Sequence, residues 1–364
     1  MEYRINQRTK DKISMIGLGT GPLFEAGEEE AMQLLETAYQ KGINYVDLAT
    51  AGGKTFSYLG KAYSSVRDQM LYQIHFGADY KTGEYGWTTN LDTVKEQIDW
   101  QLKELKTNYI DYGFIHCLDE QSDWLAYQRN GVLDYLLKMK KEGVVHHIGL
   151  SSHTPKLAKE IIETGLVDQL MFSINPGYDM QYGEFANGST SERMELYRLC
   201  ETKGIGISVM KPFSAGQLLN AKTSPFKKEL SIYQCIQYAL DKPGVLTVLP
   251  GIGNIKDLEE ILHFFDVDPS FRDYSILGEL SPEKTTGTCV YCNHCQPCPA
   301  GLNIGLINKY YDLAKIGDPM AKEHYLNLDK KASDCIACGH CDQRCPFHVK
   351  QSQRMKEIAS YFSE

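Results

Sequence analysis

The stretch Ile110-Asp-Tyr-Gly-Phe-Ile-His116 is a short run of apolar, β-branched and aromatic residues that ends in a histidine. A nearly continuous apolar run is typical of a parallel strand that is covered on both faces. Similar runs recur along the chain, and we expect strands over residues 13–19, 45–49, 70–76, 110–116, 144–151, 169–175, 206–210 and 245–250. Amphipathic stretches of helical length lie between and after them, over residues 28–40, 91–105, 132–141, 155–164, 190–202, 232–240 and 255–265. The alternation indicates repeated βα units.

Eight βα units over roughly 260 residues favour a closed (β/α)8 TIM barrel. An open doubly wound sheet would more often show a Gly-x-Gly-x-x-Gly turn after its first strand, and Gly17, Gly19 and Gly21 do not have that spacing. A barrel carries its chemistry at the C-terminal ends of its strands. The polar residues at those ends are therefore the candidates for a site.

Eight cysteines form two runs in the last quarter of the chain. The runs are Cys289-x2-Cys292-x2-Cys295-x2-Cys298-Pro299 and Cys335-x2-Cys338-x2-Cys341-x3-Cys345-Pro346. Such runs hold 4Fe-4S clusters in bacterial two-cluster ferredoxins, where the fourth cysteine of each run ligates the cluster of the other run. We therefore assign Cys289, Cys292, Cys295 and Cys345 to one cluster, and Cys335, Cys338, Cys341 and Cys298 to the other.

Zinc sites and disulfides are the alternatives for these cysteines. Zinc sites draw two or three ligands from each of two short stretches, which suits four closely spaced cysteines poorly. The N-terminal sequence shows no charged leader followed by an apolar core, and no apolar run approaches the roughly 20 residues needed to cross a bilayer. We expect a cytoplasmic protein of a low-oxygen setting, without disulfides and without a membrane partner.

The 364 residues suffice for one large domain and one small one. We expect the barrel over residues 1–280 and a small, α-helical, ferredoxin-like domain over residues 281–364, with helices at 304–315 and 350–362. The formal net charge of −9 disfavours a nucleic-acid partner. The expected partners are a small-molecule substrate and an electron carrier of the ferredoxin or flavodoxin type.

Several strand ends together resemble the aldo/keto reductase family. The matching stretches are Gly42-Ile-Asn-Tyr-Val-Asp47-Leu-Ala49 with Leu59-Gly60-Lys61-Ala62, Tyr109 to His116, Gly143-Val-Val-His-His-Ile-Gly149-Leu-Ser151, Met210-Lys-Pro212-Phe-Ser-Ala-Gly216, and Pro250-Gly251-Ile-Gly-Asn254 leading to Leu258-Glu-Glu260. They occur in the family's order over residues 10–265. One branch of this family is fused to a ferredoxin-like domain, which agrees with the cysteine-rich tail.

The resemblance implies a catalytic set of aspartate, tyrosine, lysine and histidine, in which the tyrosine protonates the carbonyl oxygen while NADPH supplies hydride. Asp47 and His116 match two of these positions, but Gly52 stands at the position of the tyrosine and His75 at that of the lysine. Because a histidine titrates near neutral pH, we expect Asp47, His75 and His116 to manage protons. The candidates for the missing proton donor are Tyr58, Lys54, Tyr178 and Lys211, and a lid or substrate wall is expected from Tyr80, Tyr85 and Trp87.

The cofactor of the barrel stays open between NAD(P)H and FMN. The family's nicotinamide contacts align with Ser151, Ser152, Met171 and Met210, so a glutamine and a tyrosine are replaced by methionines. Gly251, Gly253 and Asn254 open a helix after the eighth strand, where barrels often bind phosphate; a tight glycine turn capped by Asn254 is the alternative. The expected cofactor-binding residues are Ser151, Asn175, Pro212, Gly216, Gly251, Gly253 and Asn254.

Three functions are compatible with this sequence. The first is an iron-sulfur oxidoreductase that reduces or oxidises a small carbonyl or alcohol substrate with electrons passed through the two clusters. Hydride carries two electrons and each cluster one, so coupling them needs a flavin or a substrate that holds an unpaired electron. The alternatives are an NAD(P)H-dependent carbonyl reductase with structural clusters and a non-catalytic electron-transfer protein.

Overall fold

The computed structural model describes residues 1–279, 287–318 and 320–363. These residues group into two compact units, of which the first comprises Met1–Ile174, Ile205–Pro212 and Leu246–Val267. The second comprises Asn175–Gly204, Phe213–Val245 and Asp268–Glu364. The domain boundary expected near residues 280–287 falls largely outside the described residues, so residues 1–280 and 281–364 remain the proposed domains.

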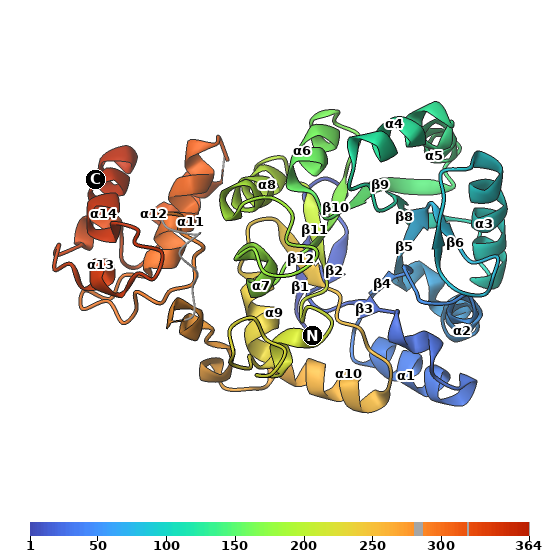
Figure 1. Ribbon diagram of the computed structural model, residues 1–364, viewed down its shortest axis with the longest axis horizontal. Helices are drawn as coiled ribbons and strands as arrows, with labels where there is room; N and C mark the ends of the chain where they lie inside the picture. Colours follow the sequence, from blue (N-terminus) through green and yellow to red (C-terminus); the bar gives the residue numbers. More distant parts are fainter. Residues whose placement is uncertain (280–286, 319, 364) are drawn as a thin grey trace. The chain divides into compact units, whose positions relative to one another are not determined.

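The strands form one eight-stranded parallel sheet that curls into a barrel (Figure 1). In spatial order they are β3 (Leu18–Gly19), β4 (Tyr45–Asp47), β5 (Leu71–Phe76), β8 (Ile110–Ile115), β9 (Val145–Ser152), β10 (Gln169–Ser173), β11 (Gly206–Met210) and β12 (Val245–Val248). The first and last strands meet, because the Gly17 amide donates to the Val248 carbonyl and the Gly19 amide to the Pro250 carbonyl, each at 3.0 Å. The predicted (β/α)8 barrel is confirmed.

Helices alternate with the strands of the first unit (Figure 1). They are α1 (Glu28–Gln40), α2 (Lys54–Tyr63), α3 (Leu91–Glu104), α4 (Gln121–Arg129), α5 (Val132–Lys141), α6 (Pro155–Glu163) and α10 (Ile255–Leu262). Helices α1 and α5 have the predicted bounds, whereas α2 and α4 were not predicted. Helix α4 begins with a capping box between Glu120 and Asp123, a pattern with glutamate at the cap that differs from the usual Ser or Thr.

Two short hairpins also depart from the sequence prediction. The stretch expected as one strand over residues 13–19 is divided, because β2 (Lys12–Ser14) pairs antiparallel with β1 (Tyr3–Ile5) before β3 begins. A second hairpin, β6 (Ala78–Asp79) with β7 (Gly86–Trp87), follows β5 directly. Its strands have two residues each, which is too short for a period-two pattern to be recognised.

The hairpin β6–β7 is fixed to the strand ends around it. The Thr88 amide donates to the Gly77 carbonyl at 2.9 Å, and the Tyr80 amide to the Gln97 side chain of α3 at 2.9 Å. The Tyr80 hydroxyl lies 3.2 Å from the Leu48 carbonyl, just beyond β4. The loop between β6 and β7 is therefore held over the ends of β4 and β5.

The second unit contains helices from the middle of the chain as well as the cysteine-rich tail. Its helices are α7 (Pro176–Asp179), α8 (Thr190–Thr202), α9 (Ile232–Leu240), α11 (Ile304–Lys315), α12 (Ala321–Leu326), α13 (His340–Arg344) and α14 (Gln351–Phe362). Helix α11 has the predicted bounds, and α14 begins one residue later than predicted. Buried Ile304, Ile307, Met355, Ile358 and Phe362 form the core of the tail.

Buried polar groups join the two sequence regions of this second unit. Arg198 of α8 donates to the Tyr291 hydroxyl at 2.8 Å and lies 3.5 Å from the Asp312 carboxylate of α11, which also pairs with Arg354 of α14. The buried Lys242 ammonium donates to the Val290 carbonyl at 3.0 Å. The segment between the first two cysteines is thus anchored to the end of α9.

Among the described residues, no helix combines the length and apolar character that a membrane span requires.

Candidate active site

A line of hydrogen bonds runs through the C-terminal mouth of the barrel. The Asp47 Oδ1 atom lies 2.8 Å from His75 Nε2, and His75 Nδ1 lies 2.9 Å from His116 Nδ1. The line ends at Tyr85, whose hydroxyl lies 2.7 Å from His116 Nε2. We call Asp47, His75, His116 and Tyr85 the proton line.

The first three members come from neighbouring strand ends. Asp47 ends β4, His75 lies near the end of β5, and His116 follows β8; these strands are adjacent in the sheet. Their side chains are buried, whereas Tyr85 is 43% exposed. The three residues expected to manage protons thus lie in hydrogen-bond contact, and the line leads from the buried carboxylate to a phenol that solvent reaches.

With an ionised Asp47 and neutral imidazole rings, the contacts allow one consistent set of proton positions. The Gln73 side-chain NH2 donates to Asp47 Oδ1 at 2.9 Å and to the Met171 sulfur at 2.9 Å, which uses both of its protons. An ionised carboxylate only accepts, so His75 Nε2–H donates to Asp47. In neutral rings His75 Nδ1 then accepts from His116 Nδ1–H, and His116 Nε2 accepts from the Tyr85 hydroxyl. Every donor points toward Asp47.

A second set of buried polar side chains supports the carboxylate from inside the barrel. The Gln73 carbonyl oxygen accepts from the Tyr45 hydroxyl at 2.7 Å and from Ser208 at 3.0 Å. The Gln169 side chain in turn donates to the Tyr45 hydroxyl at 2.6 Å. Because buried polar networks are costly unless fully satisfied, these bonds hold Gln73, and through it Asp47, in one orientation.

The surroundings keep His116 neutral. Burial lowers the pKa of His116 well below its usual 6.5, and the nearby His75, His153 and Lys211 lower it further. Burial also raises the pKa of the Tyr85 phenol, with Cys117 and Asp119 acting in the same direction. At neutral pH the line therefore ends in a protonated phenol that faces a neutral imidazole.

The structure explains why a tyrosine is absent at position 52. The loop that contains Gly52 pairs with the β6–β7 loop: Gly52 forms an antiparallel bridge with Glu84, and the Tyr85 amide donates to the Ala51 carbonyl at 3.0 Å. A Cβ atom at Gly52 would lie 2.1 Å from the ring of Phe24. Tyr85 enters the site from this neighbouring loop, and sequence reasoning treated it only as a lid residue.

The other candidates for the missing proton donor lie in different contacts. The Tyr58 hydroxyl and the Lys54 ammonium both donate to the Ala26 carbonyl, at 3.3 and 3.2 Å. Tyr178 belongs to the second compact unit. Lys211 lies at the end of β11, with its ammonium 3.2 Å from His153 Nε2.

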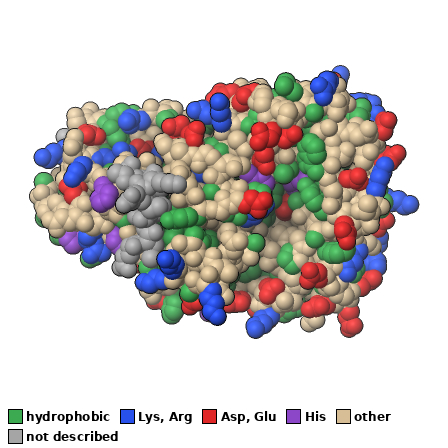
Figure 2. Space-filling view, viewed as in Figure 1, with side chains coloured by type: hydrophobic (Ala, Val, Ile, Leu, Met, Phe, Trp, Pro, Cys, Tyr) green, Lys and Arg blue, Asp and Glu red, His purple; other side chains and the backbone are tan. Residues whose placement is uncertain are grey.

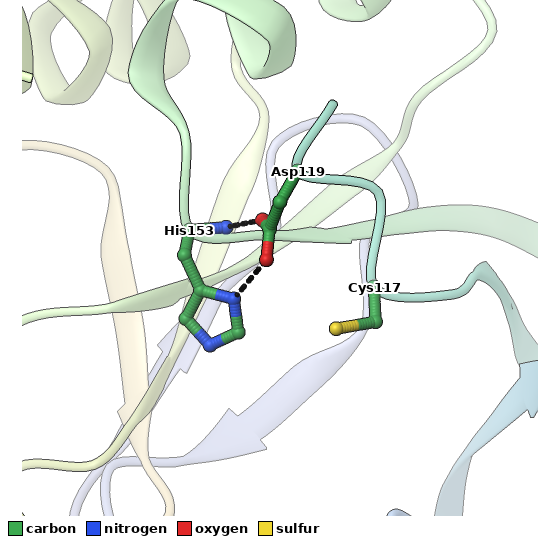
Figure 3. A group of neighbouring side chains, drawn as sticks. All are labelled: Cys117, Asp119 and His153. Atoms are coloured by element: carbon green, nitrogen blue, oxygen red, sulfur yellow. Dashed lines mark hydrogen bonds and ion pairs between the residues drawn. The ribbon is translucent and has the colours of Figure 1, made fainter. Parts of the chain in front are cut away.

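A second polar group lies in the loops after β8 and β9. The donor atoms of Cys117, Asp119 and His153 all lie within 4.8 Å of one another (Figure 3). Asp119 accepts from the His153 amide at 2.6 Å and from its Nδ1 at 2.8 Å. Burial pushes the pKa of Asp119 upward, but its hydrogen bonds with His153 outweigh burial and hold the pKa below the usual range.

Two features of this group disfavour a metal ion. Burial raises the pKa of the Cys117 thiol to about 11, so the sulfur is a thiol at neutral pH. The Lys211 ammonium beside His153 opposes a further cation at short range.

In the space-filling view, histidine side chains reach the surface over the barrel among acidic and hydrophobic side chains (Figure 2).

The expected nicotinamide contacts are largely apolar or occupied. Met171 and Met210 pack in a buried cluster with Tyr45, Tyr112 and Phe114. Ser151 is buried, and its carbonyl accepts from the Leu118 amide at 3.0 Å. A thioether cannot supply the paired donor and acceptor of an amide.

The remaining expected cofactor residues show three different environments. Pro212 is buried after β11, Asn175 caps α7 by accepting from the Tyr178 amide at 2.9 Å, and Gly216 has a φ of 82° at the start of a short 3-10 helix. Asn175 and Gly216 belong to the second compact unit, whereas Pro212 and Ser151 belong to the first.

The glycine turn before α10 already holds a carboxylate. Asp257 accepts from the Gly253 amide at 3.1 Å and from the Asn254 side chain at 3.0 Å, while Asn254 caps the helix. Gly251 packs against Pro22. A phosphate at these donors would meet the negative charge of Asp257, so the geometry favours the alternative of a tight turn with a capping asparagine.

Cysteines of the two runs lie close together in the tail. One cavity is lined by Cys295 and Cys298 of the first run together with Cys335, Cys338 and Cys341 of the second. Cys345 of the second run affects the pKa of Cys292 and Cys295 of the first. The two runs therefore lie beside each other, and the assignment of each cysteine to one cluster stays a prediction.

We predict that Gly52→Ala lowers the free energy of unfolding by about 1–3 kcal/mol, because the added methyl group overlaps the Phe24 ring. Urea unfolding followed by tryptophan fluorescence measures it, since all three tryptophans lie in the first unit. Gly21→Ala, with no atom within 4 Å of its new Cβ, is the matched control. In a Phe24→Ala background Gly52→Ala should cost much less; an equal cost would contradict the overlap.

The low pKa of His116 predicts a pH-dependent stability. Below pH 6.5 the unfolded chain binds a proton at His116 that the folded chain excludes. The contribution of His116 to the free energy of unfolding is therefore present in full above pH 6.5 and is lost as the pH falls below 6.5. The slope is at most about 1.4 kcal/mol per pH unit. His116→Gln should flatten the dependence of the urea midpoint on pH between pH 7 and 5.5, and an unchanged slope would show that His116 is protonated in the folded protein.

Comparison with known proteins identifies both parts of the chain. The Aldo/keto reductase family matches residues 15–232, and a 4Fe-4S dicluster domain matches residues 285–349. The chain is 25% identical over 295 residues to L-galactose dehydrogenase of Arabidopsis thaliana, covering 71% of this chain and 86% of that protein. It is 24% identical over 270 residues to an uncharacterized oxidoreductase, YqkF, of Bacillus subtilis, covering 68% and 86%.

Solved structures show the same barrel. The holo form of the aldo-keto reductase AKR11C1 from Bacillus halodurans superposes with a TM-score of 0.63 at 19% identity, covering 78% of this chain and 97% of that one. An aldo/keto reductase from Klebsiella pneumoniae in complex with NADP and acetate gives a TM-score of 0.58 at 16% identity, with coverages of 78% and 97%. The chain is an oxidoreductase of the aldo/keto reductase family that carries a C-terminal 4Fe-4S dicluster domain.

Proposed function

We propose that this protein is an iron-sulfur oxidoreductase that interconverts a small carbonyl compound and its alcohol, with electrons supplied through two 4Fe-4S clusters. The observation that carries the proposal is the proton line, which joins Asp47, His75 and His116 at the barrel mouth. Carbonyl reduction consumes two protons for every two electrons. A chain of hydrogen-bonded groups that leads to an exposed phenol suits that demand.

The tail has a donor set that suits the clusters. Five thiols from both runs line one cavity, and the buried His340 Nε2 beside them has no hydrogen-bond partner among the described residues. Such a nitrogen can donate to a cluster sulfide, and hydrogen bonds of this kind tune cluster potentials. Cys298, Cys335, Cys338 and Cys341 would hold one cluster, and Cys289, Cys292, Cys295 and Cys345 the other; when bound, each supplies one electron at a time.

The barrel residues bind and orient the substrate and move protons. His116 Nε2 accepts from Tyr85. Asp119, His153 and Lys211 lie at the same mouth of the barrel. An ammonium and an imidazole there can hold an electron-rich oxygen of the substrate. The buried methionines Met171 and Met210 leave no amide for a nicotinamide in the usual pose, which favours direct electron supply or FMN over NAD(P)H.

The proposal is tested with full-length, cluster-loaded protein under anaerobic conditions. Reduced methyl viologen, a one-electron donor, should be oxidised on addition of benzaldehyde or glyceraldehyde, with two viologens consumed for each alcohol formed. NADPH should support much slower turnover or none. Failure to reduce either aldehyde with viologen would contradict the proposed function, and rapid NADPH oxidation with viologen inactive would support the conventional reductase instead.

Replacing the fourth cysteine of either run should remove a cluster without unfolding the barrel. We expect Cys298→Ala and Cys345→Ala each to lower the iron content from about eight atoms per chain and to abolish viologen-dependent turnover. The urea midpoint reported by the barrel tryptophans should change little. Cys235→Ala, a buried thiol outside both runs, is the matched control, and its iron content should equal that of the wild type. Full iron in both fourth-cysteine variants would refute the ligand assignment.

A further inference from the structure

We propose that Tyr85 is the group that exchanges a proton with the substrate oxygen, and that Asp47, His75 and His116 resupply it. The inference rests on the proposed function and adds a catalytic residue to it. Tyr85 is the exposed end of the proton line, with its hydroxyl 2.7 Å from His116 Nε2. Aldo/keto reductases place the tyrosine on the loop after the second strand, whereas Tyr85 comes from the β6–β7 loop after the third strand of the barrel.

The position of Tyr85 is built into the fold. Its amide donates to the Ala51 carbonyl at 3.0 Å, and the Gly53 amide donates to the Gly83 carbonyl at 3.0 Å. Its ring packs edge-on to Tyr80, with centroids 6.2 Å apart. A loop fixed to its neighbour on both sides of Gly52 holds the phenol at one place, which general acid catalysis requires.

The side chains around the phenol also fix its partner. The Trp87 indole nitrogen donates to the His116 carbonyl at 3.3 Å, so Tyr85 and Trp87 both contact His116. Gly77 directly precedes β6, and a Cβ atom there would approach the His116 Cβ to 3.3 Å. Its φ of 134° is a conformation that favours glycine. The hairpin can therefore turn directly over His116.

The line can deliver one proton with a complete balance. When it carries one extra proton, Asp47 is neutral, His75 Nδ1–H points to His116, His116 Nε2–H points to Tyr85, and the phenol proton points to the substrate. Transfer of that proton to the carbonyl oxygen is followed by a shift of one proton along each link. The result is the arrangement inferred from the contacts, in which every donor points toward an ionised Asp47.

The whole reduction balances with a one-electron donor. The carbonyl carbon gains two electrons from two reduced viologens and one proton from water, and its oxygen gains the proton from Tyr85. The C=O π bond is replaced by a C–H and an O–H bond. Water at the exposed phenol then returns one proton to the line. In the oxidative direction each step runs backward, and Tyr85 accepts the hydroxyl proton.

Several titratable groups face the phenol. His116 lies at the end of β8, Cys117 and Asp119 lie in the loop after it, and Tyr80 lies in the same hairpin as Tyr85. The apparent pKa values in the pH dependence of turnover therefore describe these coupled groups together, not one residue. Removing the phenol should change this dependence, because the line then no longer reaches the substrate.

The test compares Tyr85→Phe with Tyr58→Phe in the viologen and benzaldehyde assay, with cluster-loaded full-length protein. Tyr58 is the matched control because its hydroxyl donates to the Ala26 carbonyl, outside the line. We expect Tyr85→Phe to lower kcat by about 100-fold or more, to leave KM within about threefold, and to alter the pH profile of kcat. Added imidazole should restore part of the rate. Tyr58→Phe should match the wild type.

The outcomes separate the two proposals. Wild-type kcat and pH profile in Tyr85→Phe would overturn the role of Tyr85 and leave the proposed function standing. A wild-type protein that reduces no aldehyde would overturn the proposed function and, with it, this role. Nitrogen-15 NMR of the histidines gives a readout without substrate: the His116 Nε2 signal should move in Tyr85→Phe and not in Tyr58→Phe. An unmoved signal would refute the hydrogen bond on which the inference depends.

Discussion

The buried carboxylate of Asp47 is the constraint on which the geometry of the barrel mouth depends. A buried charge is costly unless hydrogen bonds compensate it, and Asp47 receives them from His75 and Gln73. With a neutral ring, His75 donates to this carboxylate through Nε2 and presents its Nδ1 lone pair to His116. His116 then donates through Nδ1, so its Nε2 accepts the hydrogen bond from the Tyr85 hydroxyl. The proton positions of four side chains therefore follow from one ionised group.

The replacement of a lysine position by His75 changes the electrostatics of this site. A lysine cation beside Asp47 would neutralise the carboxylate and lower the pKa of a neighbouring phenol. His75 supplies no permanent cation, and burial raises the pKa of Tyr85 instead. The phenol then keeps its proton at neutral pH. Each imidazole can accept a hydrogen bond at one nitrogen and donate one at the other. His75 and His116 together therefore connect the Tyr85 phenol to the Asp47 carboxylate, which a single lysine side chain would not do.

Much of this architecture follows from the sequence, for identifiable reasons. The barrel strands are nearly continuous apolar runs, and helices such as α1, α5 and α8 begin and end where their amphipathic patterns do. The cysteine runs define the tail by their spacing. The contact between Asp47, His75 and His116 follows from the adjacency of parallel strand ends, which places side chains at one edge of the sheet.

The contacts that sequence reasoning missed depend on loop geometry. The β6–β7 hairpin has two-residue strands, and its position over Gly52 depends on backbone bonds between loops about 30 residues apart, such as that from Tyr85 to Ala51. No local pattern encodes such a pairing. One signal was present: Gly52 removes a side chain at the mouth, and Tyr85-Gly86-Trp87 supplies aromatic groups in the next loop. A phenol that moves to another loop leaves one loop without its side chain and adds an aromatic side chain to the neighbouring loop. Because the Phe24 ring fills the space beside Gly52, a tyrosine approaches His116 from the β6–β7 loop instead.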